Sequence, residues 1–189
     1  MNISQKNYAV KRVKEVYIQS LEALVERYNF KMIETYNSYQ LKISNIFTAK
    51  LQKGKFFINP CIEMVENNSK PMNDFNNSDI TTKRQMVANG KYNYMLQAMR
   101  EGRKTLALET IPSTSLKDIL PGFKATVEAM NKEFVQVIKD MITNLEAIKL
   151  NIKALCDQTV DTIMLGDDAS QVINVINNFE RQVSEFIQQ

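Results

Sequence analysis

The chain of 189 residues contains no histidine and no tryptophan, and it has only two cysteines. Without histidine it can form neither a Ser-His nor a Cys-His nucleophile pair, and imidazole is not available as a general acid or base. Two cysteines without histidine are too few ligands for a structural zinc site within one chain. Chemistry based on Glu or Lys alone stays open, but no pair of residues stands out for it. We therefore predict that the protein is not an enzyme and nominate no catalytic, cofactor-binding or metal-binding residue.

The two cysteines, Cys61 and Cys156, occur in unrelated contexts. We interpret them as reduced thiols packed as small apolar groups, with a disulfide between them as the alternative. No stretch approaches the run of about 20 apolar residues that a membrane-spanning helix needs, and the first residues contain no apolar core of a signal peptide. These features predict a cytoplasmic protein, and we do not expect a membrane as its partner.

Glycine and proline are also scarce, at five and four residues. This is too few for a turn-rich β-sandwich, and good helix formers fill most of the periodic segments. The expected fold is all-α, an elongated antiparallel helical bundle that ends in a long helical hairpin of coiled-coil type. The sequence divides into an amphipathic helical region (1–66), a polar linker (67–79), a basic helical or crossover segment (80–114) and the C-terminal hairpin (115–189). One structural domain overall is expected.

The region 1–66 begins with a long amphipathic pattern. Because Asn29 alone is a weak helix breaker, we favour one continuous or gently kinked helix from about Ser4 to Lys53, with two helices as the alternative. The stretch from Asn67 to Asp79 is rich in asparagine and contains Pro71, so it is predicted to be a loop or disordered linker. Asp79 is then placed to cap a helix that Asn89 and Gly90 interrupt.

The segment that follows holds the densest group of basic residues in the chain, with tyrosines interleaved. Cationic side chains beside aromatic rings suit a phosphate backbone with exposed bases. Three methionines in the same segment indicate instead that one face packs against protein. The candidate nucleic-acid contacts are Lys83, Arg84, Lys91, Arg100, Arg103 and Lys104.

The hairpin is predicted from the absence of Gly and Pro between Phe123 and Leu165. At 1.5 Å per residue, a helix over residues 121–165 would be about 67 Å long. Gly166 is placed to end this helix, Asp167 or Asp168 is placed to cap the next one, and the second helical pattern reaches Ile187. The apolar residues of the first helix follow a heptad seam with one stutter before Leu145. Its first-half members are Phe123, Val127, Met130, Phe134, Val137 and Met141.

A second apolar stripe beside this seam consists of Val135, Ile138 and Ile142. A two-stranded coil would leave it exposed to water, so it must contact a further neighbour, either the N-terminal helical region or another copy of the chain. We therefore expect these three residues to form a partner or oligomer interface.

The leading function hypothesis is a non-catalytic helical interaction or assembly protein, such as a scaffold, an adaptor, or a secretion-associated or virion component. It would self-associate or bind a protein partner. The alternative is a nucleic-acid-binding protein that uses residues 83–104 and oligomerises through the hairpin. A membrane-active helical toxin is a third hypothesis, which the charged exterior of the helices disfavours. The high asparagine content hints at an AT-rich bacterial or phage genome.

Overall fold

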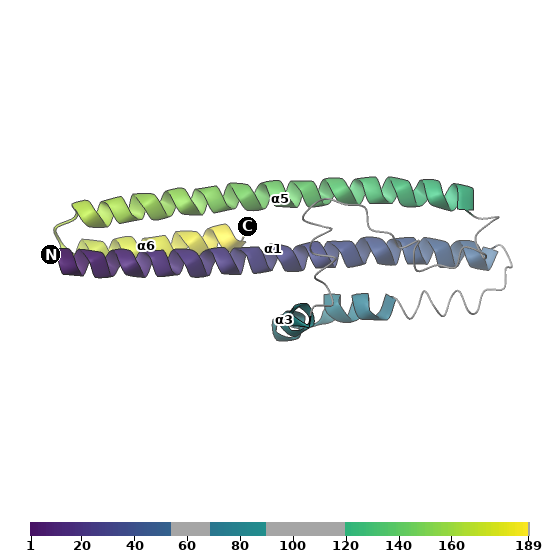
Figure 1. The fold of residues 1–189 in the computed structure, drawn as a ribbon, viewed down its shortest axis with the longest axis horizontal. Helices are drawn as coiled ribbons and strands as arrows, with labels where there is room; N and C mark the ends of the chain where they lie inside the picture. The colour runs from purple at the N-terminus through teal and green to yellow at the C-terminus, as the bar shows by residue number, and fades with distance from the viewer. Residues whose placement is uncertain (54–68, 90–119, 189) are drawn as a thin grey trace. The chain divides into compact units, whose positions relative to one another are not determined.

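The computed structural model describes residues 1–53, 69–89 and 120–188, and every regular element in these ranges is an α-helix (Figure 1). The elements in chain order are α1 (Ile3–Lys53), a helix over residues 69–77, α3 (Ile80–Ala88), α5 (Leu120–Leu165) and α6 (Ala169–Gln188). These helices confirm the all-α bundle and the long C-terminal hairpin. They form two compact units, which we call the terminal unit (Met1–Tyr28 with Ile142–Gln189) and the central unit (Asn29–Met141).

Helix α1 is unbroken over 51 residues, which confirms the continuous helix expected from the sequence. Asn29 lies inside it without ending it. The intrinsic cost of asparagine in a helix is a fraction of a kcal/mol, about 0.7 at most, so packing on both sides of the residue outweighs it.

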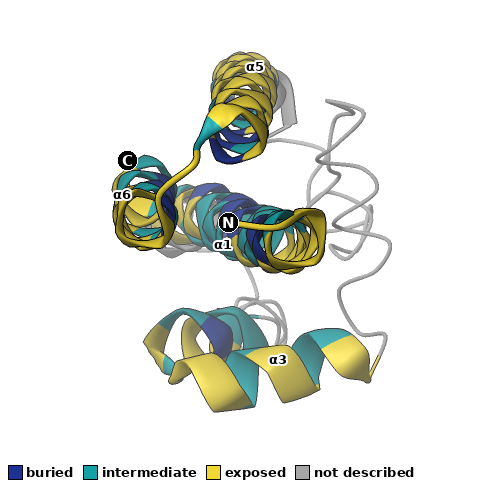
Figure 2. Cartoon of the chain, turned by 90° about the vertical axis from the view of Figure 1, so that its left-hand side faces the viewer, coloured by how far each residue is buried: buried dark blue, intermediate teal, exposed yellow. Residues whose placement is uncertain are grey.

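The terminal unit packs the first part of α1 against the second part of α5 and the whole of α6. The amino group of Met1 donates a 3.2 Å hydrogen bond to the carbonyl oxygen of Asp167 in the hairpin turn, and Arg27 reaches the carbonyl oxygen of Gln188 at 3.1 Å. Within this unit, α1 therefore runs parallel to α6 and antiparallel to α5. The buried faces of the three helices are turned toward one another (Figure 2). They include Val13, Leu24, Ile152, Ile163, Val172, Phe179 and Val183.

Cations from α1 meet the carboxyl ends of both hairpin helices. The ammonium of Lys6 donates a 2.9 Å hydrogen bond to the carbonyl oxygen of Met164, and Arg27 donates to the carbonyl oxygens of Ile187 and Gln188. The last carbonyl groups of a helix have no partner within the helix, and they carry the negative end of its dipole. The same three contacts thus fasten α1 to α5 and α6.

The turn between α5 and α6 uses the predicted residues. The carboxylate of Asp168 accepts a 3.0 Å hydrogen bond from the backbone N–H of Ser170, as expected of an N-cap. Gly166, by contrast, does not adopt the left-handed conformation that a helix-ending glycine commonly has. Its importance is steric, because a Cβ there would lie 3.2 Å from the carbonyl oxygen of Thr162.

In the central unit, the second part of α1 contacts two neighbours. Its Tyr36 and Tyr39 lie against Phe134 of α5, with ring centroids 6.1 and 5.5 Å apart. On another face, Phe30 meets the edge of Phe75 at 6.3 Å. Helix α1 therefore supplies cover for the first part of α5, which was one of the two alternatives that the sequence left open.

The expected linker is wrong over residues 69–77, which form a helix that includes Pro71. Phe75 is the cause, since it is fully buried beside Phe30. The amide of Asn37 adds hydrogen bonds to the carbonyl oxygen of Met72 at 3.4 Å and to Asn76 Oδ1 at 3.0 Å. Burial of one large aromatic residue thus outweighs the low helix propensity of an asparagine-rich segment.

The buried seam of α5 also differs from the predicted heptads. Steps of four outnumber steps of three among its buried residues, which brings the period closer to the 3.6 of a straight helix than to the 3.5 of a heptad repeat. Met130, Val137 and Met141 of the predicted seam are consequently only half-buried. The buried set is Phe123, Val127, Asn131, Phe134, Ile138, Leu145, Ile148, Ile152, Cys156, Thr159 and Ile163.

Candidate interaction surface

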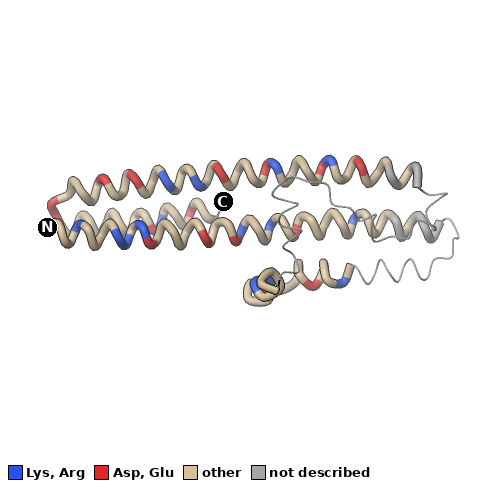
Figure 3. Tube along the Cα trace, viewed as in Figure 1, with Lys and Arg blue, Asp and Glu red and all other residues tan. Residues whose placement is uncertain are grey.

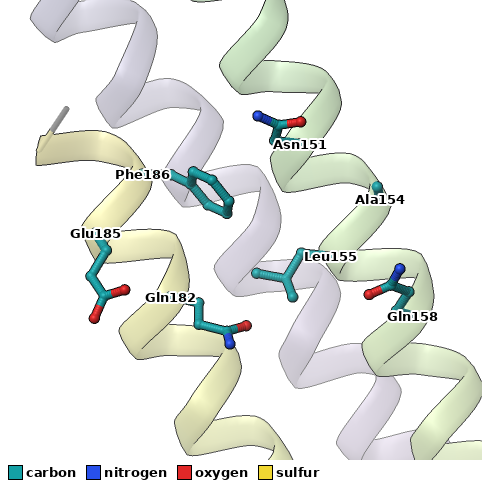
Figure 4. A pocket seen from close by; sticks show the side chains of 7 residues that line it. All are labelled: Asn151, Ala154, Leu155, Gln158, Gln182, Glu185 and Phe186. Carbon is teal, nitrogen blue, oxygen red and sulfur yellow. The ribbon is translucent and has the colours of Figure 1, made fainter.

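An open groove lies between α5 and α6 in the terminal unit (Figure 4). Its volume is about 500 Å³. Leu155 of α5 points into the space between the helices, as do Gln182 and Phe186 of α6. Both apolar side chains are half-buried, so the fold does not fully cover them. The complete lining is Asn151, Ala154, Leu155, Gln158, Gln182, Glu185 and Phe186.

A regular row of exposed, uncharged residues on α5 lines one side of this groove and extends beyond it. The positions alternate steps of three and four, so they share one face of the helix. We call this row the uncharged strip. It consists of Asn144, Ala147, Asn151, Ala154 and Gln158, all of which are exposed.

The charged residues of this part of α5 lie on a different face. Glu146 and Lys149 form a 3.3 Å ion pair, and Lys153 and Asp157 continue along the same flank. A helix turns by about 100° per residue, so this flank points well away from the uncharged strip. Acidic and basic residues are interspersed along α5 (Figure 3). The uncharged strip therefore interrupts an otherwise ordinary mixed surface.

A second depression, of about 530 Å³, lies nearer the hairpin turn. Leu165 at its edge is 84% exposed, the highest value among the exposed large apolar residues of the described chain. No residue that lines this depression carries a charge, and its lining is Thr162, Leu165, Gly166, Gln171, Val172, Asn174 and Val175. When the lining residues of the groove and of the second depression are taken together, only Glu185 is charged. It forms a 2.9 Å ion pair with Arg181.

Two of the six candidate nucleic-acid contacts lie in the described part of the chain. The ammonium of Lys83 forms a 2.5 Å ion pair with Glu34 and lies 5.6 Å from the ring centre of Phe75. Its side chain is only 13% exposed, so its charge is used inside the central unit. Arg84 is exposed on α3. Lys91, Arg100, Arg103 and Lys104 fall outside the described residues.

The three candidate interface residues differ from one another in burial. Ile138 is fully buried within the chain, whereas Val135 and Ile142 are half-buried. Ile142 belongs to the terminal unit and the other two to the central unit. Ile138 belongs to the core of the chain itself, so a partner could contact only Val135 and Ile142 of this stripe.

The perturbed titratable groups have structural causes. The thiol of Cys156 is free and buried. Burial is the larger cause of its raised pKa, and the negative charge of Asp157 is a smaller one. Burial and the acceptor Glu133 raise the pKa of Tyr39 to about 12. The backbone N–H of Thr82 lowers the pKa of the Asp79 carboxyl, which confirms that residue as the N-cap of α3.

One buried polar atom in the described chain lacks a hydrogen-bond donor, namely Oδ1 of Asn37. Within residues 1–53, 69–89 and 120–188, no group of three or more Cys, Asp or Glu side chains is placed to hold a metal ion. No helix in the same ranges is long and apolar enough to cross a membrane. Comparison with protein-family models, with curated proteins and with solved structures gives no match to this chain.

The uncharged strip was not predicted from the sequence, although its residues have heptad spacing. Apolar periodicity does not reveal it, because its members are alanine and carboxamide residues. Leu155 lines the groove, and Thr162 lines the second depression.

Proposed function

We propose that the protein is a non-catalytic helical assembly protein that binds another protein helix in the groove between α5 and α6. The proposal rests on the scarcity of charge in this groove and in the second depression, where Glu185 is the one charged lining residue, in a chain of which 24% is charged. Solvated helix faces usually carry charged residues, whereas the cores of protein interfaces are depleted in them.

The shape of the groove supports the same function. Two neighbouring helices leave a channel into which the side chains of a third helix can pack. Leu155 and Phe186 lie half-buried on its two sides and would lose their remaining contact with water on binding. Burying apolar surface contributes about 25 cal/mol per Å², so these two side chains would supply a central part of the binding energy.

Purification of the full chain under native conditions tests the proposal. Light scattering should show an assembly larger than one chain, or mass spectrometry should identify a protein that copurifies in fixed proportion. A strict monomer without such a protein would overturn the proposal. Because the chain lacks tryptophan, its ratio of absorbance at 260 and 280 nm responds strongly to bound nucleic acid, so the same sample also tests the nucleic-acid alternative.

A further inference from the structure

We propose that the groove between α5 and α6 binds α5 of a second copy of this chain, with the two α5 helices antiparallel about a two-fold axis that passes between Asn151 and Ala154. This inference rests on the proposed function and names its partner. It follows from three properties of the uncharged strip, which are its polarity, its spacing and the position of the nearest charges.

The polar groups of the uncharged strip are carboxamides, which both donate and accept hydrogen bonds. A surface of Asn and Gln can therefore satisfy an identical surface, whereas a charged surface requires its opposite. The exposed face of α1 in the same unit carries Lys11, Lys14 and Glu15. Placing that face in the groove would bury charges without partners, which is costly. The strip is therefore a better complement to itself than the charged face of α1 is.

The spacing of the strip allows two copies to interdigitate. In an antiparallel pair of helices, the first heptad position of one helix faces the fourth heptad position of the other. In the strip, the first positions are Asn144, Asn151 and Gln158, and the fourth positions are Ala147 and Ala154. Asn151 then lies opposite Ala154 of the partner subunit, and Ala147 lies opposite Gln158 of the partner subunit. Asn151 and Gln158 each lie opposite an alanine, so large and small side chains alternate across the contact and the two helices can approach closely. Asn151 also lies near its own copy across the two-fold axis, and the two carboxamides can hydrogen-bond to each other.

The charge that follows the strip selects the antiparallel arrangement, because Asp161 continues the spacing of the strip three residues after Gln158. A parallel pair would place Asp161 directly against its own copy, and like charges side by side disfavour an interface. In the antiparallel pair, Asp161 lies opposite Asn144 of the partner subunit, whose amide N–H groups can donate to the carboxylate. Lys149, Lys153 and Asp157 stay on the solvated flank in either case.

Sedimentation velocity on the full chain over a wide concentration range tests the partner and the surface. The test variant is Ala154→Glu, which puts a carboxylate into the centre of the strip at an exposed position. The matched control is Ser184→Glu, which adds the same charge at an exposed position of α6 away from the groove. Both substitutions introduce a good helix former, and circular dichroism should show unchanged helicity.

We expect the native chain and Ser184→Glu to form dimers, and Ala154→Glu to remain monomeric at every concentration at which the native chain dimerises. A dimer that survives Ala154→Glu would overturn the assignment of this surface. A strictly monomeric native chain would overturn the second copy as the occupant. In that case a copurifying protein would still support the proposed function, so failure of this inference and failure of the function are distinguishable.

Cross-linking of single exposed thiols tests the orientation. In a Cys61→Ser chain, a short bis-maleimide should join two copies of Asn151→Cys, because this residue lies close to the two-fold axis. Gln158→Cys should not cross-link, since the antiparallel register separates its two copies by about 16 Å along the helix axis. Efficient cross-linking of Gln158→Cys would show a parallel pair and overturn the orientation. Cys156 is buried and does not interfere.

Discussion

The hydroxyl of Tyr39 donates a 2.8 Å hydrogen bond to Oε1 of Glu133, which joins α1 to α5 within the central unit. The ring of Tyr39 also lies 5.5 Å from that of Phe134, and its residue is only 9% exposed. Burial disfavours the tyrosinate and the carboxylate of Glu133 repels it, so the pKa of Tyr39 rises from 10.0 to about 12.

This hydrogen bond predicts a loss of stability in alkaline solution. A raised pKa means that the fold favours the neutral phenol, so its contribution is complete below pH 10 and disappears as the pH approaches about 12. The free energy of unfolding, measured by urea denaturation, should fall more steeply over this window in the native chain than in Tyr39→Phe. Tyr8→Phe removes a phenol that is 76% exposed and should leave the slope unchanged. Equal slopes for all three chains would contradict the prediction.

Phe179 is predicted to hold α6 in place. It is 1% exposed at the centre of the buried face of α6, so Phe179→Ala leaves a cavity. Such substitutions cost about 3–5 kcal/mol of unfolding free energy. Ile173→Ala on the same helix removes a side chain that is 59% exposed and should change stability by no more than about 0.5 kcal/mol. Thermal and urea unfolding measure both, and similar losses in the two variants would refute this packing of α6.

Phe75 is predicted to hold the helix over residues 69–77 against α1. Amide hydrogen exchange should be slow in this helix in the native chain, because opening it requires Phe75 to leave its buried site. In Phe75→Ala the same amides should exchange much faster, with the hydrogen bonds from Asn37 weakened as well. Asn73→Ala changes an exposed residue of the same helix and serves as the control. Fast exchange in the native chain would restore the linker that the sequence suggested.

Cys156 is predicted to react only when the terminal unit opens. Its thiol is 5% exposed and burial raises its pKa, so both access and the thiolate fraction are low in the native chain. In a Cys61→Ser chain, a disulfide reagent at neutral pH should label Cys156 slowly, and rapidly after addition of denaturant. The same chain with Ser184→Cys should gain one rapidly labelled thiol. Rapid labelling of Cys156 itself in the folded chain would be inconsistent with this core.

The helices and the hairpin turn could be predicted because they depend on neighbouring residues. Continuous helical periodicity specifies α1 and α5, and no Gly or Pro lies within α1 or between Phe123 and Leu165 of α5 to end either helix. Asp168 and Asp79 act as N-caps as expected, since an N-cap needs only the N–H groups of the next two or three residues.

The helix over residues 69–77 could not be predicted, because its stability comes from Phe30 and Asn37, more than thirty residues away in the chain. The polar composition of the segment describes its local preference and contains no information about this distant contact. Lys83 is a similar case, since its charge looks available in the sequence and is paired with Glu34 in the fold.

The uncharged strip depends both on local sequence and on long-range packing. Periodicity along the chain establishes that Asn144, Ala147, Asn151, Ala154 and Gln158 share one helix face, and this much can be read from spacing. Whether that face lies in the core or beside an open groove depends on where α1 and α6 pack around α5. Helix formation is a property of local sequence, whereas the exposure of each face is decided by long-range packing.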